Sequence, residues 1–173
     1  MHPSSVDNMK KMRSQYLQYL NEIKNPKVLD VGGLYNHPEK TYRRLFEDIP
    51  GLEWIVADIV QHTSVDIVMT GPYSLPFEDE TFDLVVSVQM LEHFSNPFKS
   101  VAEMRRVLKT GGRLALAAPS AGPRHDAQDG WRFMDDGFRF IAEDIGGIKI
   151  IYAYFENEDV IEFITLVKKR FVH

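Results

Sequence analysis

The densest group of chemically versatile side chains in the sequence lies in one stretch, RHDAQDGWRF at positions 124–133. It holds an imidazole, two carboxylates, an indole and two guanidinium groups. His125 is the candidate general base, because an unperturbed imidazole titrates near neutral pH. Asp126 or Asp129 would orient it. This stretch is therefore where we expect a proton to be removed from a substrate.

Three residues of the same stretch are candidates for binding a substrate. Trp131 offers a flat face for a sugar or an aromatic ring, Arg132 offers a hydrogen-bonding fork, and Asp129 offers a carboxylate. Structural roles are the alternatives, with Trp131 and Phe133 anchoring the stretch to the core. Arg132 would then pair with an acid of the following segment: Asp135, Asp136 or Glu143.

A second histidine competes for the role of base. His93 begins a loop after an apolar segment, where it would act as the base or only hydrogen-bond the backbone. A metal site is a further alternative, because His125, Asp126 and Asp129 offer nitrogen and oxygen ligands that suit a divalent ion. Isolated His and Asp residues in loops usually hold no ion, so the sequence predicts no metal.

Another candidate site lies where two apolar segments end. The first segment contains Asp30 and closes with Gly32 and Gly33, and the second closes with Asp58. A glycine lets the backbone approach a ligand where a Cβ atom would collide. An acid at the end of the second strand can accept two hydrogen bonds from ribose hydroxyls. The alternative is that the glycines mark only a turn and that Asp58 only caps a loop.

Apolar and amphipathic segments alternate along the chain, which predicts strands that alternate with helices. The expected strands are 27–33, 53–59, 65–69, 82–88, 113–118, 148–155 and 160–171, and the expected helices lie within 1–25 and at 38–48, 97–108 and 135–143, the third stopped by KTGG at 109–112. The predicted fold class is α/β, a Rossmann-like doubly wound, mostly parallel sheet of about seven strands with a C-terminal antiparallel hairpin. Ligands bind such sheets at the carboxyl ends of the strands.

Composition narrows the class of protein further. The 173 residues suit one domain, and the 44% hydrophobic content suits one core. A net charge of -5 argues against a protein that binds duplex nucleic acid. The lack of cysteine excludes disulfides, thiolate metal sites and cysteine nucleophiles. With no signal-peptide pattern and no apolar run of about 20 residues, we expect a cytoplasmic protein without a membrane partner.

Five segments together resemble class I S-adenosylmethionine-dependent methyltransferases. They are VLDVGG (28–33), IVADI (55–59), SLPFEDETFDLVVS (74–87), MLEHFSNP (90–97) and EMRRVLKTGGRLALAAP (103–119). A lone glycine motif would be weak support, whereas Leu-Pro-Phe, Phe-Asp, Leu-Glu-His and Arg-Val-Leu-Lys-x-Gly-Gly in this order are specific. The resemblance covers residues 28 to 119 and implies S-adenosyl-L-methionine as cofactor, with S-adenosyl-L-homocysteine as product.

The resemblance also implies roles for individual residues. Asp58 would hold the ribose hydroxyls, Ile59 would lie against the adenine, and Ser74 and Leu75 would lie along the adenine edge. Asp83 would order the backbone between strands. The full set of implied cofactor-binding residues is Asp30, Gly32, Gly33, Asn36, Asp58, Ile59, Ser74, Leu75 and Gln89.

Two departures from the family pattern concern the cofactor loops. The usual Gly-x-Gly-x-Gly is replaced by GGLYN at 32–36, so the path of this loop must differ and Tyr35 or Asn36 would reach the ligand. The stretch before Leu-Pro-Phe often carries an acid that binds the adenine amine. Here it reads TGPY (70–73), and Tyr73 or a backbone carbonyl would substitute.

The expected function is methyl transfer to a small-molecule acceptor, at an oxygen of a sugar or secondary metabolite. The alternatives are a catalytically silent binding or regulatory domain, a nicotinamide-dependent oxidoreductase, and a methyltransferase for a macromolecule. We expect a single domain, 1–173, with a helical cap (1–25), a cofactor-binding core (27–119), an acceptor-side loop and helix (120–147) and a terminal hairpin (148–173). No nucleic-acid partner is expected, and a homodimer is compatible with the compact chain.

Overall fold

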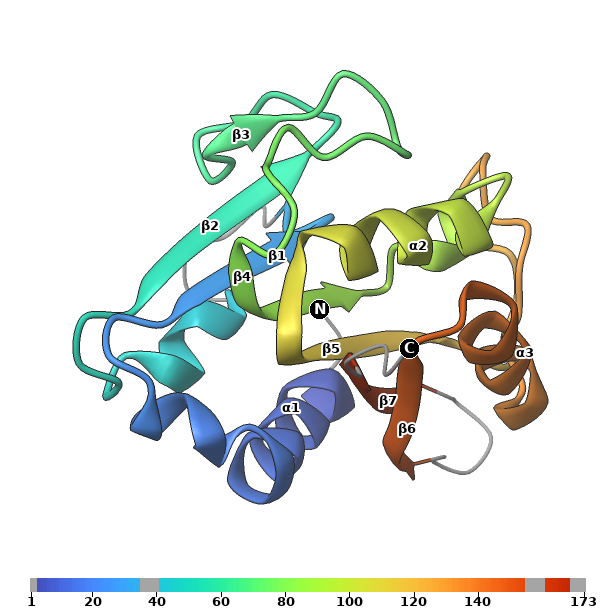
Figure 1. The fold of residues 1–173 in the computed structure, drawn as a ribbon. Coiled ribbons are helices and arrows are strands. Elements are labelled where there is room, and N and C mark those ends of the chain that lie inside the picture. Colours follow the sequence, from blue (N-terminus) through green and yellow to red (C-terminus); the bar gives the residue numbers. More distant parts are fainter. Residues whose placement is uncertain (1–2, 35–40, 155–160, 169–173) are drawn as a thin grey trace.

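A central sheet with helices on both faces forms the body of the protein (Figure 1). The computed structural model describes residues 3–34, 41–154 and 161–168. The strands are β1 (Lys27–Val31), β2 (Glu53–Asp58), β3 (Ile67–Val68), β4 (Phe82–Val88), β5 (Leu108–Pro119), β6 (Ile148–Tyr154) and β7 (Ile161–Lys168). The α-helices are α1 (Pro3–Tyr16), α2 (Pro97–Val107) and α3 (Asp135–Ile145), and the 3-10 helices are η1 (Gln18–Glu22), η3 (Tyr42–Phe46) and η4 (Leu91–His93).

The order of the strands in the sheet is β3-β2-β1-β4-β5-β7-β6. The first five of these pair in parallel, and β7 pairs antiparallel with both β5 and β6. The strand order reverses between β1 and β4, where Val28 lies between Trp54 and Leu84. The predicted α/β Rossmann-like parallel sheet is thereby confirmed. Its carboxyl-terminal edge beside β1 and β4 is the place where such sheets bind ligands.

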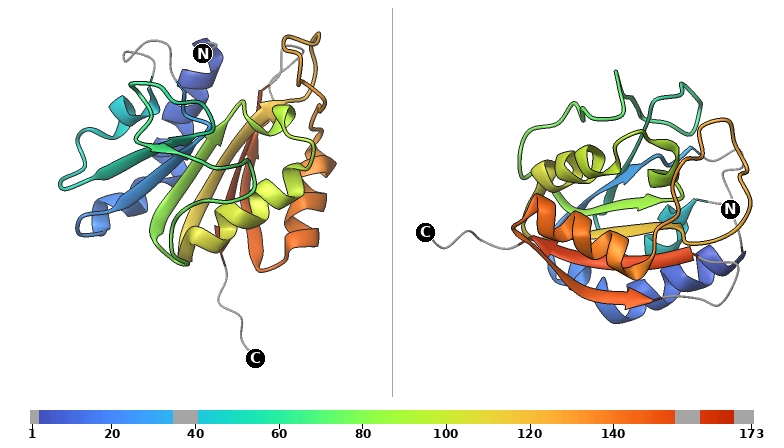
Figure 2. Two further views of the ribbon diagram at one scale, coloured as in Figure 1. Left: turned by 90° about the horizontal axis from the view of Figure 1, so that it is seen from above. Right: turned by 90° about the vertical axis from the view of Figure 1, so that its right-hand side faces the viewer.

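Helices lie on both faces of the sheet, as the view from above in Figure 2 shows, and an apolar layer on each face holds them to it. Side chains alternate between the two faces along a strand, so Leu114 and Leu116 of β5 join one layer and Ala115 and Ala117 join the other. Helices α2 and α3 bury their apolar faces in the first layer. The second layer receives α1, through Met9 and Met12, together with η1 and η3.

Three expected elements differ from the structure. The helix expected at 38–48 is reduced to the short η3, and residues 35–40 lie outside the described part of the chain. The N-terminal helix ends at Tyr16 and continues as η1. The helix before Lys109–Gly112 ends at Val107 as expected, but the strand expected at 113–118 begins earlier, at Leu108, so Lys109–Gly112 lie within β5, where Phe82 pairs with Leu108 and Leu84 with Arg113. The surplus residues form a bulge.

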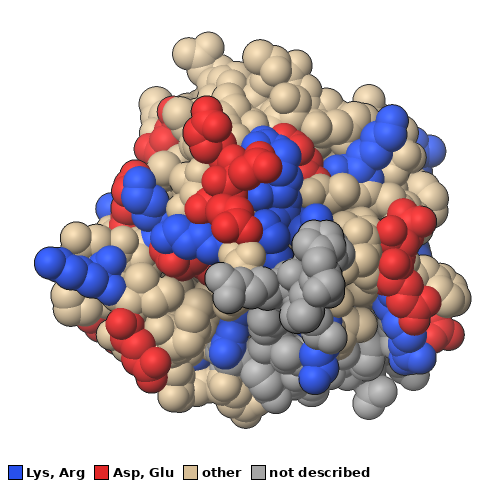
Figure 3. All heavy atoms as spheres, in the orientation of Figure 1, with Lys and Arg blue, Asp and Glu red and all other residues tan. Residues whose placement is uncertain are grey.

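Charged side chains of both signs are intermingled on the face seen in Figure 3. Among the ion pairs of the described residues, the guanidinium group of Arg106 in α2 binds the carboxylates of Glu103 and Asp79. Asp83 has the structural role expected for it: it accepts the Lys27 backbone N–H and pairs with Lys109. Within the described residues, no helix is both long and apolar enough to cross a membrane.

Candidate functional site

Three parallel strands deliver residues to one cavity at their carboxyl ends. Gly32 follows β1, Asp58 ends β2 and Gln89 follows β4, and all three line a cavity of about 430 Å³. Ile59, Met69, Met90, His93 and Phe94 also line it, as do residues 126–128 of the acceptor-side loop. We call this space the strand-end cavity. Its volume lies within the range of small-molecule sites.

Gln89 occupies an unusual position in this cavity. Its backbone is left-handed, with φ of 56°, and its N–H donates to Ala117 O at 2.8 Å. The Nε2 atom of its side chain is buried and finds no hydrogen-bond partner among the described residues. A buried donor without a partner costs free energy, so this amide is suited to a polar group of a bound ligand.

Asp58 has a carboxylate with capacity for a ligand. The residue is only 8% exposed and lines the strand-end cavity. Its Oδ1 atom accepts the Val60 N–H at 2.9 Å, so the loop-capping role weighed from sequence is real. The second oxygen remains for a hydroxyl of a ligand. Ile59, which is 48% exposed, presents an apolar side chain beside it.

The glycine pair serves packing as much as access. Gly32 has φ of +76°, and a Cβ atom there would lie 2.6 Å from Met90 Cγ. A Cβ atom on Gly33 would lie 2.8 Å from Asp30 Cγ. Asp30 is buried at 1% exposure and, like Gly33, is not among the residues that line the strand-end cavity. Of Asp30, Gly32 and Gly33, which were expected to bind the cofactor, only Gly32 lines the strand-end cavity.

The positions expected along the adenine edge do not reach this cavity. Leu75 is buried in the core, because its N–H donates to Glu103 and its carbonyl accepts from Arg106. Ser74 is exposed and lines neither this cavity nor its neighbour. Asn36, also expected in the cofactor site, lies outside the described residues.

A second cavity, of about 590 Å³, adjoins the first. We call it the loop cavity, because the loops after β4 and β5 supply most of its lining, including Glu92, His93, Asp129 and Trp131. The residues that line both cavities are Ile59, His93, Phe94, Ala127 and Gln128. Tyr73 lines only the loop cavity, where its hydroxyl bonds Ser95 at 2.7 Å.

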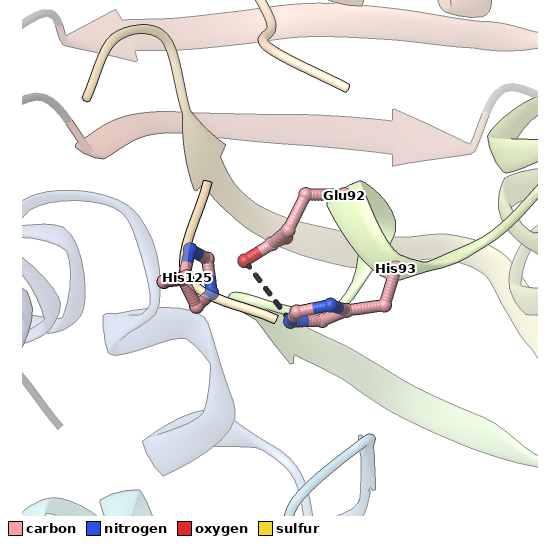
Figure 4. A group of neighbouring side chains, drawn as sticks. All are labelled: Glu92, His93 and His125. Carbon is pink, nitrogen blue, oxygen red and sulfur yellow. Dashed lines mark ion pairs between the residues drawn. The ribbon is translucent and has the colours of Figure 1, made fainter. Parts of the chain in front are cut away.

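The two rival histidines lie side by side (Figure 4). Their ring centroids are 5.2 Å apart in an edge-to-face arrangement. The Nδ1 atom of His93 is 2.8 Å from Gln128 O, and the Nδ1 atom of His125 is 2.9 Å from Asp129 Oδ2. The expectation that Asp126 or Asp129 orients His125 is thus met by Asp129. His125 itself does not line either cavity.

Arg132 binds the other side of this carboxylate. Its guanidinium group bonds both oxygens of Asp129, with Nη2 to Oδ2 at 2.9 Å, and also Pro123 O. This ion pair holds the pKa of Asp129 well below its usual range and raises that of Arg132. Asp129, and not one of the acids weighed in 135–143, is the carboxylate that Arg132 binds. Arg132 therefore acts on the loop rather than lining the cavity.

Trp131 combines the two roles weighed for it. Its indole Nε1 donates to Phe94 O at 2.7 Å, and its ring stacks against Phe133 with centroids 6.3 Å apart. These contacts anchor the loop. The side chain nevertheless remains 39% exposed and lines the loop cavity, where it presents an aromatic face.

Glu92 is the residue of this site that the sequence did not single out. It lies on η4 with no exposed surface, and neither carboxylate oxygen has a hydrogen-bond partner among the described residues. Burial raises its pKa to about 7. Its one charged contact is wide, 3.6 Å from Oε1 to His93 Nε2. The available signal was an acid that follows the apolar pair Met90 and Leu91 and lies two residues before Phe94, which is an unusual place for an unpaired charge.

Comparisons with known proteins point to a methyltransferase domain. Residues 43–116 match the family model described as a methyltransferase domain. The chain is 26% identical over 126 residues to a demethylmenaquinone methyltransferase of Renibacterium salmoninarum, a match that covers 69% of this chain and 53% of the relative. The chain thus spans about half the length of this curated relative and smaller shares of others.

Solved structures show the fold independently. An S-adenosylmethionine-dependent methyltransferase from Aquifex aeolicus superposes with a TM-score of 0.65 at 17% identity, covering 97% of this chain and 99% of that one. The 1,6-didemethyltoxoflavin-N1-methyltransferase of Burkholderia thailandensis, with its substrate and S-adenosylhomocysteine bound, gives 0.73 at 15% identity, covering 95% and 78%. The fold of this chain is that of these enzymes.

Proposed function

Since the chain carries a class I S-adenosylmethionine-dependent methyltransferase domain, we propose that it transfers a methyl group to an oxygen of a small-molecule acceptor such as a sugar or a secondary metabolite. S-Adenosylmethionine would occupy the strand-end cavity and the acceptor the loop cavity. The observation that carries the proposal is the shared wall of these cavities, formed around His93 and Phe94. Methyl transfer needs two ligands that meet at one point, and this wall is such a point.

The residues of the strand-end cavity fit the cofactor. The unpaired Gln89 amide and the second oxygen of Asp58 are a donor and an acceptor for a polar ligand, and Ile59 supplies an apolar surface. When bound, the sulfonium of the cofactor supplies an electrophilic methyl group, and little further activation is required of the protein. The contribution of this chain is to hold and orient the cofactor and the acceptor and to exclude water from them.

The loop cavity offers polar and aromatic surfaces to an acceptor. Arg132 is committed to Asp129 and the loop backbone, whereas Arg124 lines the cavity and donates to the carbonyls of Asp126 and Ala127. Trp131 presents the aromatic surface on which sugars and flat rings pack. A hydroxyl acceptor must lose a proton, and His93, which lines both cavities, is the group placed to receive it through Nε2. His125, which contacts His93 but not the cavities, would support it.

This proposal assigns parts of the chain as the sequence led us to expect. The described part of 27–119 is assigned to the cofactor core, 120–147 to the acceptor side, and β6 and β7 to the terminal hairpin. The segment 1–25 is assigned as packing rather than as a lid, because Met9 and Met12 of α1 lie in the core and no described residue of α1 lines either cavity.

Calorimetry with S-adenosylhomocysteine tests the cofactor site. Asp58→Ala should weaken binding about 10- to 100-fold, the cost of losing hydrogen bonds to a charged group. Asp58→Asn keeps an oxygen for the Val60 N–H and separates this effect from loss of the cap. Glu53→Ala, at the exposed start of the same strand, is the matched control and should bind normally. Failure of the wild-type protein to bind S-adenosylmethionine or its product would favour the silent-domain alternative.

A further inference from the structure

A cluster of three potential metal ligands lies where the loops after β4 and β5 meet. Glu92 and His93 come from η4, and His125 comes from the loop after β5. One ligand atom from each of the three residues lies within 4.8 Å of the others. Figure 4 shows the three side chains pointing toward one another. Two imidazoles and one carboxylate are the donor set of many sites for divalent transition metals.

Glu92 gives the first independent sign of a missing partner. Its side chain has no exposed surface, and both of its oxygens are without a hydrogen bond from the described residues. A buried carboxylate without hydrogen bonds or a close cation is costly. His93 approaches it only to 3.6 Å. A cation between these side chains would satisfy the carboxylate.

The hydrogen bonds of the two histidines give a second sign. Each imidazole has its Nδ1 atom engaged with an oxygen, of Gln128 in one case and of Asp129 in the other. These contacts favour the tautomer with the proton on Nδ1, which leaves the Nε2 lone pair of each ring for a ligand. Histidines that bind metals are usually oriented in this way by a carboxylate or a carbonyl.

We propose that Glu92, His93 and His125 bind one divalent transition-metal ion such as Zn²⁺, with Asp129 and Gln128 O as the outer shell that orients the histidines. The sequence alternative, a site from His125, Asp126 and Asp129, is not the grouping that the structure makes. Asp126 instead accepts the Ala127 N–H, and Asp129 serves His125 and Arg132.

Only a small closure separates this arrangement from coordination. With metal–ligand bonds of about 2.0–2.2 Å, neighbouring ligand atoms in a tetrahedral site lie about 3.2–3.6 Å apart. Glu92 and His93 already have this spacing, at 3.6 Å. His125 must approach further, and its side chain is 52% exposed, so a rotation meets little packing.

The ion would face the loop cavity, which Glu92 and His93 line. Three protein ligands leave a position for an oxygen of the acceptor, whose pKa the ion would lower. With the ion bound, the Nε2 atom of His93 is a ligand and no longer serves as the base proposed for the metal-free site, so the hydroxyl proton passes to water. The oxygen lone pair then forms the new O–C bond as the C–S bond breaks, and the sulfonium becomes a neutral thioether. This role rests on the proposed function, whereas the binding of the ion does not.

Metal binding is tested directly on the full chain without a polyhistidine tag. After equilibration with Zn²⁺ and desalting, mass spectrometry should find about one ion per chain, and Co²⁺ should give visible absorption of a low-coordinate site. Glu92→Gln, His93→Ala and His125→Ala should each weaken Zn²⁺ binding more than about 100-fold, whereas the outer-shell change Asp129→Asn should weaken it about 10- to 100-fold. His62→Ala, a histidine bonded to Ser64 outside the cluster, is the control and should bind like the wild type.

Two results would overturn the proposal: a wild-type chain that retains no ion, or cluster variants that bind Zn²⁺ as the wild type does. Circular dichroism confirms that each variant is folded, and Glu92→Gln keeps the shape of the buried side chain. S-Adenosylhomocysteine calorimetry on the same samples separates the two proposals. A wild-type chain that binds S-adenosylhomocysteine but no Zn²⁺ rejects the metal site. A wild-type chain that binds Zn²⁺ but no S-adenosylhomocysteine rejects methyl transfer.

Discussion

The Oδ2 atom of Asp129 lies 2.9 Å from His125 Nδ1 and also 2.9 Å from the backbone nitrogen of His125. One carboxylate oxygen therefore holds both the ring and the main chain of a residue four positions earlier. The guanidinium group of Arg132 binds the same carboxylate from the other side. The acceptor-side loop is thus organised around a single buried charge.

Asp129→Asn should lower the methyl-transfer rate about 10- to 100-fold, the range typical of residues that orient a functional histidine. The neutral amide cannot satisfy Arg132 and both nitrogens of His125 together. The affinity for S-adenosylhomocysteine should stay within about two-fold, because Asp129 does not line the strand-end cavity. Turnover and calorimetry measure the two effects. Asp136→Asn, on an exposed residue of α3 that lines neither cavity, should change neither, and equal losses in both variants would contradict the special position of Asp129.

Two substitutions of Trp131 separate its contact with the acceptor from its anchoring of the loop. Trp131→Ala should raise the KM for the acceptor about 10-fold or more, since an aromatic surface of the loop cavity is lost. Trp131→Phe keeps an aromatic face but removes the hydrogen bond to Phe94 O. A KM that recovers in the Phe variant supports a packing role toward the acceptor. If both variants fail equally, the indole N–H and its anchor are what matter.

Gly32 should tolerate no side chain. Gly32→Ala places a Cβ atom at φ of +76° and 2.6 Å from Met90 Cγ, so it should destabilise the fold by about 1–3 kcal/mol. Thermal unfolding measures this. Gly71→Ala is the matched control, because nothing lies within 4 Å of its Cβ position. Adding Met90→Ala removes the contacts with Cγ and Sδ but keeps a Cβ atom at 2.9 Å, so it should recover only part of the loss, and no recovery would assign the effect to the backbone and this remaining contact.

Strands were the most predictable part of the fold. β4 was expected at 82–88 and is found there, because FDLVVSV is apolar except for Asp83 and Ser87 and follows a charged turn. The helix expected at 38–48 was not found at that length. Tyr42 and Phe46 have the apolar spacing of a helix, but the described residues form only the short η3. The 109–112 segment has the glycines of a helix stop, yet pairing with β4 continues on either side of it.

Residues of the site were predictable where the backbone alone determines their position. Asp58 ends a strand, and the topology of a parallel sheet brings such a residue to the ligand edge. Ser74 and Leu75 do not line the strand-end cavity, because Arg106 and Glu103 bind the backbone of Leu75 and hold this loop against α2. Glu92 was missed because its significance lies in missing hydrogen bonds, which a sequence does not display.

The carboxyl group of Glu103, which holds the loop at Leu75 to α2, should titrate in acid. The Arg106 guanidinium holds the pKa of Glu103 below its ordinary value, and Glu103 in turn accepts the Leu75 N–H. A carboxyl group with a lowered pKa in the folded state stabilises the protein above its unfolded pKa, near 4.5, and this stabilisation is lost as the pH falls through the folded value. Glu103→Gln should therefore lower Tm by about 2–4 °C at pH 7, with the difference from wild type shrinking toward pH 3. Glu143→Gln, on an exposed position of α3, should show no such trend, and a pH-independent difference for Glu103→Gln would mean that packing, rather than charge, holds the loop.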